Sequence, residues 1–166
     1  MENKKPVLFV GRFQPFHKGH KKVLESLTDT SDVVVVIGSS KKSGTFENPL
    51  SFSERKQLIK NHFPEIPLVG AKDMESNKKW VEQVESKTDF RKVVTGNPRT
   101  KRVFENQGYF VEKQEMYNRE KFRGTLIRKK AIESDDSWKK LVPEKSLGLL
   151  EKFGFEKRLC ETRDTS

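Results

Sequence analysis

Cysteine is almost absent from this sequence, and its scarcity excludes two kinds of architecture. Cys160 is the only cysteine among the 166 residues, so the chain forms neither an intrachain disulfide nor a metal site built from several cysteines. A chain of this length buries a continuous core without such cross-links. The low cysteine content favours a reducing compartment, and we expect a cytoplasmic protein.

Long apolar runs are missing as well. The longest aliphatic run is Val33 to Ile37, far shorter than the roughly 20 residues that cross a bilayer as a helix. The lysine-rich start, Met1 to Lys5, is not followed by an apolar signal segment. We therefore expect neither a membrane span nor secretion.

Acidic residues are outnumbered by basic ones. Lys and Arg total 34 against 24 Asp and Glu, which gives a formal net charge of +10 and a pI near 9.7. A field of this sign attracts polyanions such as nucleotides and nucleic acids. A composition in which 35% of residues are charged also serves simply to keep the surface hydrated. Net charge alone leaves the partner open.

Short apolar segments alternate with helical patterns along most of the chain. A helix after the first segment would carry Val23, Leu24 and Leu27 on one face, and the spacing of Ser51 and Glu54 fits a capping box at the start of another. Continuous apolar strands that alternate with helices predict a parallel sheet covered on both faces. The predicted fold class is α/β, a Rossmann-like domain with about five strands. The expected strands are residues 7–10, 33–37, 66–69, 92–95 and 109–111.

The C-terminal part of the sequence is helical in pattern. Two further helices are expected at 125–132 and 143–153, joined near Trp138 and ended by Gly154. We expect a single domain over residues 1–153, of which about 125–153 form the helical part. The polar segment 154–166 predicts a mobile tail.

The loop after the first strand reads Gly-Arg-Phe-Gln-Pro-Phe-His-Lys-Gly-His from Gly11 to His20. Ligands of open parallel sheets bind beyond the carboxyl ends of the strands. Gly19 lets the backbone approach a ligand closely, and the adjoining helix start offers N–H groups to an anion. His17 and His20 lie three residues apart, on one side of a helical turn, where both imidazoles can donate to phosphate oxygens. The loop predicts a phosphate site.

Other roles for these histidines are less consistent with their position. An isolated histidine is more often a core or surface residue, but two of the three histidines of this chain lie in this one turn. A zinc pair would need a third ligand, and no cysteine is near.

A second segment, Arg123-Gly124-Thr125 followed by Arg128, has the same kind of features as the Gly11–His20 loop. A glycine turn leads into a helix start with a hydroxyl cap, and a cation follows one turn later. This arrangement predicts a pyrophosphate-binding site. An ordinary helix cap with surface arginines is the alternative.

The first loop resembles the His-x-Gly-His motif of the nucleotidyltransferase superfamily, and the whole run is similar to archaeal nicotinamide mononucleotide (NMN) adenylyltransferases. The resemblance implies an enzyme that joins NMN to the AMP part of ATP and so forms NAD and pyrophosphate. The attack would be direct and in line, without a covalent enzyme intermediate. The resemblance covers roughly residues 7–153 and also rests on Asn48-Pro49 with Glu54-Arg55, Asp73 to Asn77 with Trp80-Val81, Gly96-Asn97-Pro98, and Arg123 to Arg128.

Roles for single residues follow from this resemblance. Trp80 would stack on the nicotinamide ring and Asp73 would lie beside it as the other NMN-binding residue, although spacing alone makes Trp80 equally a core residue. The expected catalytic residues are Arg12, His17, His20 and Arg128. The expected ATP-binding residues are Gly11, Arg12, Phe13, Gln14, His17, Gly19, His20, Gly96, Asn97, Arg123, Gly124, Thr125 and Arg128.

Magnesium is expected to bind mainly through the phosphates of ATP, because the sequence shows no evident carboxylate cage, and no residue is assigned as a metal ligand. The resemblance also implies a homo-oligomer, with a hexamer as the expected form. Related sequences carry a basic residue where this chain has Glu47 and a histidine near Gly44. Lys41, Lys42 and Arg55 are candidates to supply that charge.

Three alternatives stay open at this point. Another nucleotidyltransferase, such as a pantetheine-phosphate adenylyltransferase or a cytidylyltransferase, would use the same phosphate chemistry. The deamidated nicotinate mononucleotide is an alternative acceptor. A basic nucleic-acid-binding module would account for the charge but not for the paired histidines, so no nucleic-acid partner is expected.

Overall fold

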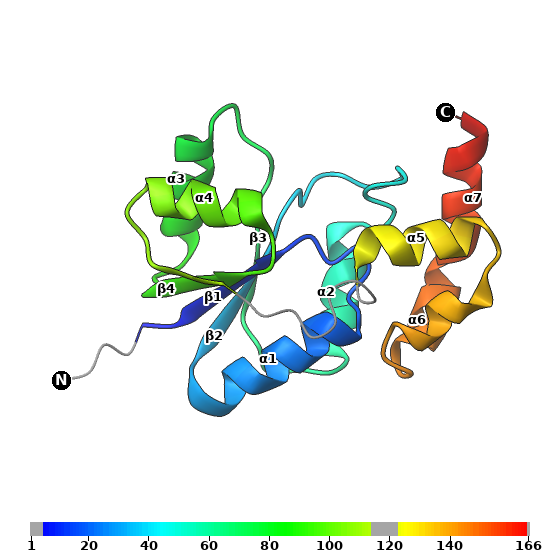
Figure 1. Ribbon diagram of the computed structural model, residues 1–166, viewed down its shortest axis with the longest axis horizontal. Coiled ribbons are helices and arrows are strands. Elements are labelled where there is room, and N and C mark those ends of the chain that lie inside the picture. Colours follow the sequence, from blue (N-terminus) through cyan, green and yellow to red (C-terminus); the bar gives the residue numbers. More distant parts are fainter. Residues whose placement is uncertain (1–4, 114–122, 166) are drawn as a thin grey trace. The chain divides into compact units, whose positions relative to one another are not determined.

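The computed structural model describes residues 5–113 and 123–165 (Figure 1). These residues group into two compact units, each made of three separate stretches of chain. Unit 1 comprises residues 5–12, 23–40 and 66–113, and unit 2 comprises residues 13–22, 41–65 and 123–165. The elements are β1 (Val7–Gly11), α1 (Lys18–Thr30), β2 (Val33–Ile37), α2 (Phe52–Lys60), β3 (Leu68–Gly70), α3 (Asn77–Lys87), β4 (Lys92–Thr95), α4 (Pro98–Asn106), β5 (Val111–Lys113), α5 (Gly124–Ile132), η1 (Asp136–Lys140), α6 (Ser146–Phe153) and α7 (Phe155–Thr165).

Unit 1 is built on a five-stranded sheet in the order β3-β2-β1-β4-β5. All neighbouring strands are parallel, and Val7 of β1 lies opposite Val33 of β2 on one side and Lys92 of β4 on the other. The β2 run of four valines and an isoleucine is buried throughout. β-Branched side chains suit a strand that is covered on both faces. The predicted parallel sheet flanked by helices is therefore confirmed.

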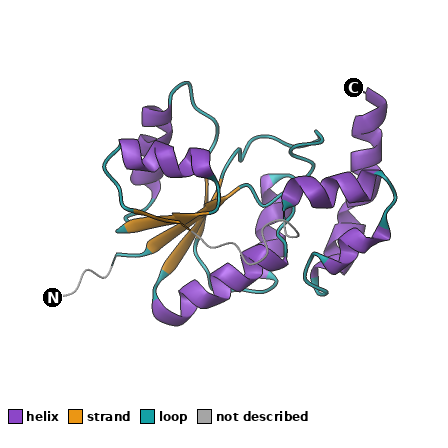
Figure 2. Cartoon of the chain, viewed as in Figure 1, coloured by secondary structure: helices purple, strands orange, loops and turns teal. Residues whose placement is uncertain are grey.

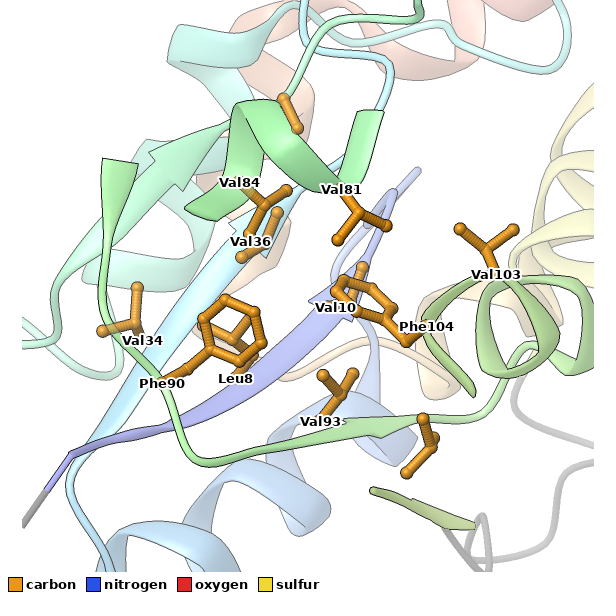
Figure 3. Close-up of a cluster of buried hydrophobic side chains, with 12 residues drawn as sticks. Leu8, Val10, Val34, Val36, Val81, Val84, Phe90, Val93, Val103 and Phe104 are labelled. Atoms are coloured by element: carbon orange, nitrogen blue, oxygen red, sulfur yellow. The ribbon is translucent and has the colours of Figure 1, made fainter. Parts of the chain in front are cut away.

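One face of the sheet packs against α3 and α4. Successive strand residues alternate between faces, so Leu8 and Val10 of β1 point to the same side (Figure 3). Phe104 of α4 is fully buried in this cluster. Each such side chain contributes on the order of 1.5–3 kcal/mol when it leaves water. The cluster comprises Leu8, Val10, Val34, Val36, Ala71, Val81, Val84, Phe90, Val93, Val103, Phe104 and Val111.

The opposite face of the sheet carries the alternate strand residues. Val7, Phe9 and Val35 are all buried, and residues 23–30 of α1 run along this side of the strands (Figures 1 and 2). Val23 and Leu24 are buried, as the helical spacing predicts. Unit 1 therefore has helices on both faces of its sheet.

The strand order reverses direction between β1 and β4. A reversal of this kind leaves a crevice at the carboxyl ends of the two strands, which is where open α/β sheets bind ligands. Here the Thr95 hydroxyl, at the end of β4, donates to the carbonyl of Val10 in β1 at 3.2 Å. Gly11 and Gly96 follow directly and begin the loops that the sequence singled out.

Unit 2 contains α2, α5, η1, α6 and α7. Ser51 caps α2 by accepting from the Glu54 N–H, while the Glu54 carboxylate accepts from the Ser51 N–H, which confirms the predicted capping box. Arg158 of α7 donates to both oxygens of the same carboxylate, at 2.5 and 2.6 Å. Trp138 of η1 is buried and its Nε1–H donates to Glu156 at 2.8 Å.

Some sequence predictions differ from the structure. The segment 154–166, expected as a mobile polar tail, forms helix α7 from Phe155 to Thr165. Phe155 and Leu159 bury their side chains, and the bonds of Glu156 to Trp138 and of Arg158 to Glu54 also hold this helix in unit 2. Gly154 ends α6 in the left-handed conformation, as predicted. Strands β3 and β5 each begin two residues later than expected, at Leu68 and Val111.

No helix of the described residues is long and apolar enough to cross a membrane. The prediction of one domain over residues 1–153 stays a prediction.

Candidate active site

The turn from Phe13 to His20 belongs to unit 2 and leads into α1. Phe13 adopts a φ of 55° and is buried, which is an uncommon conformation for a bulky residue and marks a site held by its surroundings. The rings of His17 and His20 stack with their centroids 3.5 Å apart and their planes 19° from parallel. The predicted convergence of the two histidines on one side of the turn is confirmed.

Both imidazoles are neutral near pH 7. Burial lowers the pKa of His17 to about 3, and burial followed by the neighbouring His17 lowers the pKa of His20 well below its ordinary value. Aromatic rings surround His20: Phe13 meets it edge-on at 4.7 Å, and Phe16 stacks on it at 5.8 Å. Such surroundings disfavour an imidazolium. Each ring therefore carries a single N–H.

The start of α1 offers fewer N–H groups to a ligand than the sequence predicts. The Lys18 N–H donates to the carbonyl of Leu141 at 3.0 Å, and the His20 N–H donates to Nδ1 of His17 at 3.3 Å. Gly19 lies between them and is buried. An anion at this turn would depend on side-chain donors more than on the helix backbone.

Gln14 joins this turn to the segment after the 41–47 loop. Its Nε2 donates to the carbonyl of Leu50 and its Oε1 accepts from the Leu50 N–H, both at 2.9 Å and both buried. The carboxamide thus pairs with the backbone as a neighbouring strand would. The prediction that Gln14 contacts ATP stays a prediction, but its side chain is committed to Leu50.

Helix α5 places Arg128 beside the same turn. The Arg128 guanidinium is buried and donates from Nη1 to the carbonyl of Gln14 at 2.7 Å. It also lies over the ring of Phe46, with 5.5 Å from Cζ to the ring centroid. A fixed cation therefore lies next to the histidine turn within unit 2. Charge that is held in a buried site needs no reorganisation when an anion binds.

Gly124 and Thr125 serve Arg128 in ways that differ from the prediction. A Cβ on Gly124 would lie 2.8 Å from Nη1 of Arg128 and 3.3 Å from the oxygen of Gln14, so only glycine fits without displacing the guanidinium. Thr125 was predicted to supply a hydroxyl cap, and this is wrong. The N-cap residue is Arg123, which makes no side-chain cap, and the Thr125 hydroxyl instead accepts from Nη2 of Arg128 at 3.4 Å.

The loop from Lys41 to Glu47 is exposed apart from Phe46. Arg55, one of three candidates to replace the missing basic residue, is fully buried, and its Nε donates to the carbonyl of Ser51 at 3.2 Å. Arg55 therefore belongs to the core of unit 2, and its contact with a phosphate stays a prediction. Lys41 and Lys42 remain as candidates.

The other predicted residues belong to unit 1, at the carboxyl ends of its strands. Arg12 is exposed and Gly11 accepts from the Gly38 N–H at 2.9 Å. Asn97 caps α4, since its Oδ1 accepts from Arg99 and Thr100 N–H groups. The Asn97 N–H donates to the Thr95 hydroxyl at 3.2 Å, so Asn97 is held through both its side chain and its backbone.

Asp73 and Trp80, the residues predicted to bind NMN, follow β3 in the chain. Oδ1 of Asp73 accepts from the hydroxyl of Ser39 at 3.0 Å. Ser39 has a φ of 46°, a conformation that costs energy for a residue with a side chain and that gathers at functional loops. Trp80 is half-buried, with its indole edge-on to Phe104 at 5.5 Å. It packs on the core and also keeps an exposed portion, so packing and stacking are compatible.

Within residues 5–113 and 123–165, no group of three or more His, Cys, Asp or Glu side chains could hold a metal ion. Residues 114–122, which precede Arg123, lie outside the described residues.

Sequence models of protein families identify this chain. The model of the cytidylyltransferase-like family matches residues 8–137. The chain belongs to the cytidylyltransferase-like family. Its relatives within that family include proteins named nicotinamide-nucleotide adenylyltransferase. That of Methanococcus aeolicus is 38% identical over 159 residues, covering 92% of this chain and 91% of the relative. That of Picrophilus torridus is 41% identical over 141 residues, covering 81% and 83%. The resemblance inferred from the motifs is confirmed.

Solved structures of the cytidylyltransferase-like fold agree with the topology. A bifunctional NMN adenylyltransferase/ADP-ribose pyrophosphatase from Francisella tularensis, crystallised with AMP and a manganese ion, has a TM-score of 0.72 at 22% identity. The match covers 96% of this chain but only 52% of that protein, so this chain spans about half its length. A putative nicotinate-nucleotide adenylyltransferase from Vibrio parahaemolyticus has a TM-score of 0.58 at 19% identity, covering 89% of this chain and 99% of that one.

Sequence reasoning missed several supporting residues. Leu50 and Phe46 hold Gln14 and Arg128, and their roles arise from contacts that no spacing reveals. Ser39 was detectable in part, because it lies two residues after the end of a buried strand. Thr95, whose hydroxyl joins β4 to β1, ends a strand that was predicted correctly.

Proposed function

We propose that this protein transfers the adenylyl group of ATP to NMN, forming NAD and pyrophosphate. The observation that carries the proposal is the neutral, stacked His17–His20 pair beside the buried guanidinium of Arg128. Two hydrogen-bond donors and a fixed cation suit a polyphosphate. The relatives named nicotinamide-nucleotide adenylyltransferase support the same activity.

The reaction needs no protein nucleophile. An oxygen of the NMN 5′-phosphate forms a bond to the α-phosphorus of ATP, the bond from that phosphorus to the β-phosphate oxygen breaks, and pyrophosphate leaves with the electron pair. The imidazole N–H groups would donate to oxygens that gain charge in the transition state, and Arg128 would neutralise the leaving group. Positioning and electrostatic stabilisation supply most of the rate in such transfers.

Arg12, at the end of β1, is the remaining predicted catalytic cation. Arg12 is exposed, and its guanidinium would donate to phosphate oxygens. Gly11, Gly96 and Asn97 would lie along the adenosine part of ATP, at the strand ends where open sheets bind nucleotides.

A divalent cation would accompany ATP, and we propose magnesium. The described residues offer no cage of three carboxylates or imidazoles, so phosphate oxygens and water would supply most of its ligands, as is usual for this ion. Its chemistry would be to neutralise phosphate charge. The manganese in the Francisella protein is a divalent ion of the same kind.

The identity of the adenylyl acceptor is proposed from the chemistry of Asp73 and Trp80. A partly exposed indole suits a flat, cationic nicotinamide ring, and a carboxylate accepts hydrogen bonds from a carboxamide but repels the carboxylate of nicotinate. We therefore propose NMN as the preferred acceptor. We also propose a cytoplasmic enzyme that assembles as a homo-oligomer, with a hexamer as the expected form.

A product assay tests this function. The enzyme is incubated with ATP, magnesium and one acceptor at a time, namely NMN, nicotinate mononucleotide or phosphopantetheine, and CTP replaces ATP in a parallel series. We expect NAD from ATP and NMN, with a loss of about 10²–10³ in kcat for His17→Ala, the usual effect of deleting one transition-state donor. Adenylylation of phosphopantetheine in place of NMN would overturn the acceptor, and no nucleotidyl transfer at all would overturn the function.

A further inference from the structure

The two histidines of the turn also form the capping box of α1. The carbonyl of His17 accepts from the Lys21 N–H at 3.0 Å, so His17 is the N-cap residue and His20 is the third residue of the helix. The His20 N–H donates to Nδ1 of His17 at 3.3 Å, and the His17 N–H donates to Nδ1 of His20 at 3.2 Å. Ser51 and Glu54 make the same reciprocal pair of bonds at the start of α2. In α1, imidazoles take the place of hydroxyl and carboxylate.

These two bonds determine where each ring carries its proton. Nδ1 can accept from a backbone N–H only when it has no hydrogen of its own, and a neutral imidazole then carries its hydrogen on Nε2. Burial keeps both rings neutral, with the pKa of His17 lowered to about 3. Both rings are therefore Nε2–H tautomers, and both present that N–H on the edge opposite the helix backbone.

The rings also support each other directly. Their centroids are 3.5 Å apart, so one ring limits the rotation of the other. Removal of the His17 ring takes away the acceptor for the His20 N–H and one face of the stack together. Removal of the His20 ring takes away the acceptor for the His17 N–H.

We propose that His17 and His20 act as one unit, in which the imidazole capping box holds both rings as Nε2–H donors toward phosphate. Each histidine is thus a positioning residue for the other as well as a donor in its own right. The proposal rests on the proposed function only for the phosphate, because the tautomers and the cap exist without a ligand. Loss of one ring should cost the donor that is removed and part of the donor that remains.

Conservative variants separate capping from donation. His17→Asn keeps an acceptor at the N-cap position, where asparagine is among the preferred residues, whereas His17→Ala does not. His20→Gln keeps an acceptor at the third position, where glutamine completes a capping box, whereas His20→Ala does not. We expect each alanine variant to have a kcat about tenfold below that of its amide counterpart, of the order of one transition-state contact or less. The double alanine variant should lose much less than the product of the two single losses.

The closing experiment is ¹⁵N NMR of the histidine rings in the enzyme without substrates. We expect both rings of the wild type to be protonated on Nε2 and His20 to keep sharp Nε2–H signals in His17→Asn. In His17→Ala the His20 ring signals should shift and broaden, because the first turn loses its cap and the ring loses its stacking partner. A wild-type ring protonated on Nδ1 would overturn the proposal, as would unchanged His20 shifts in His17→Ala. If His17→Ala does not fold, His17 in His20→Gln and His20→Ala gives the same comparison. An enzyme inactive with NMN that still shows the expected shifts would overturn only the proposed function.

Discussion

The neutral histidine pair connects pH to stability at the scale of single residues. The folded pKa of His17 is about 3, against about 6.5 in an unfolded chain. Between about pH 6.5 and pH 3, His17 binds a proton in the unfolded state but not in the folded state. The stability that depends on the neutral His17 ring is therefore complete above about pH 6.5 and is lost as pH falls toward 3. The free energy of unfolding should decline by about 1.4 kcal/mol per pH unit for each such histidine.

Urea unfolding of the wild type and of His17→Asn, from about pH 7.5 to about pH 4.5, measures this dependence. We expect the variant to lose less stability on acidification, while His62→Asn, a change at the third histidine of the chain, serves as the control. Parallel pH profiles for the wild type and His17→Asn would show that the buried ring does not carry the effect.

Gly124 controls the position of Arg128. A methyl group on Gly124 would lie 2.8 Å from the guanidinium, so Gly124→Ala should displace it from the carbonyl of Gln14. We expect the KM for ATP to rise about tenfold, the effect of losing one charge-assisted hydrogen bond. Gly148→Ala is the matched control, because its helical site is open and alanine there should stabilise α6 by roughly 0.5–1 kcal/mol. Equal ATP kinetics in the two variants would remove Gly124 from the site.

Substitutions of Trp80 distinguish a role in stacking on the substrate from a role in packing the core. If the exposed part of the indole stacks on nicotinamide, Trp80→Ala should raise the KM for NMN by several-fold, since such contacts contribute about 1 kcal/mol, and leave the KM for ATP nearly unchanged. Trp80→Phe should retain most of the affinity. Both Michaelis constants and the thermal midpoint are measured on one preparation. A drop in midpoint with equal losses for both substrates would mean that the contact with Phe104 is the whole role of Trp80.

At the scale of the element, helix α7 should be required for the stability of unit 2. Phe155 and Leu159 are both buried, and Arg158 holds the Glu54 carboxylate that caps α2. Burial alone would raise the pKa of Glu54, but the hydrogen bonds from Arg158 and Ser51 and the charge of Arg158 outweigh it and lower the pKa. A chain ending at Gly154 should lose several kcal/mol of stability. Lys157→Ala, an exposed change in the same helix, should change little.

Thermal unfolding followed by circular dichroism compares these chains. A truncated protein with an unchanged midpoint would contradict this prediction and would agree with the sequence-based expectation of a mobile tail.

The sequence predicts best those helices and strands whose local residue pattern matches their burial in the folded protein. Strand β2 consists of five buried β-branched residues, and in β4 three buried β-branched residues follow Lys92; the bounds of both strands match the prediction. Helix α7 was missed because its burial rests on only two apolar side chains among polar ones. In the site, the pairing of His17 with His20 followed from their spacing. The bond from Arg128 to Gln14 joins residues 114 positions apart, so no local pattern reveals it.

At the scale of the whole molecule, the net charge of +10 should govern how fast anionic substrates arrive. Salt screens such attraction over a Debye length of about 10 Å at 0.1 M. We expect kcat/KM for ATP to fall several-fold when the ionic strength rises from about 0.05 to 0.5 M, while kcat changes little. Sucrose at matched viscosity is the control for slower diffusion. A kcat/KM that does not respond to salt would assign the charge to hydration of the surface alone.

Residues that contact one another in unit 2 lie far apart in the sequence. This affects the order in which the parts of the protein become complete during synthesis. All five strands of unit 1 have been translated by residue 113, at a point when neither Arg128 nor Arg158 exists. At roughly 5–20 residues per second, the ribosome needs a few more seconds to supply the partners of Gln14 and Glu54. Until then the nascent chain carries the histidine turn without the guanidinium that lies beside it. Newly made chains should therefore complete unit 2 last, so termination between residues 113 and 127 yields products that hold all five strands of unit 1 and lack Arg128.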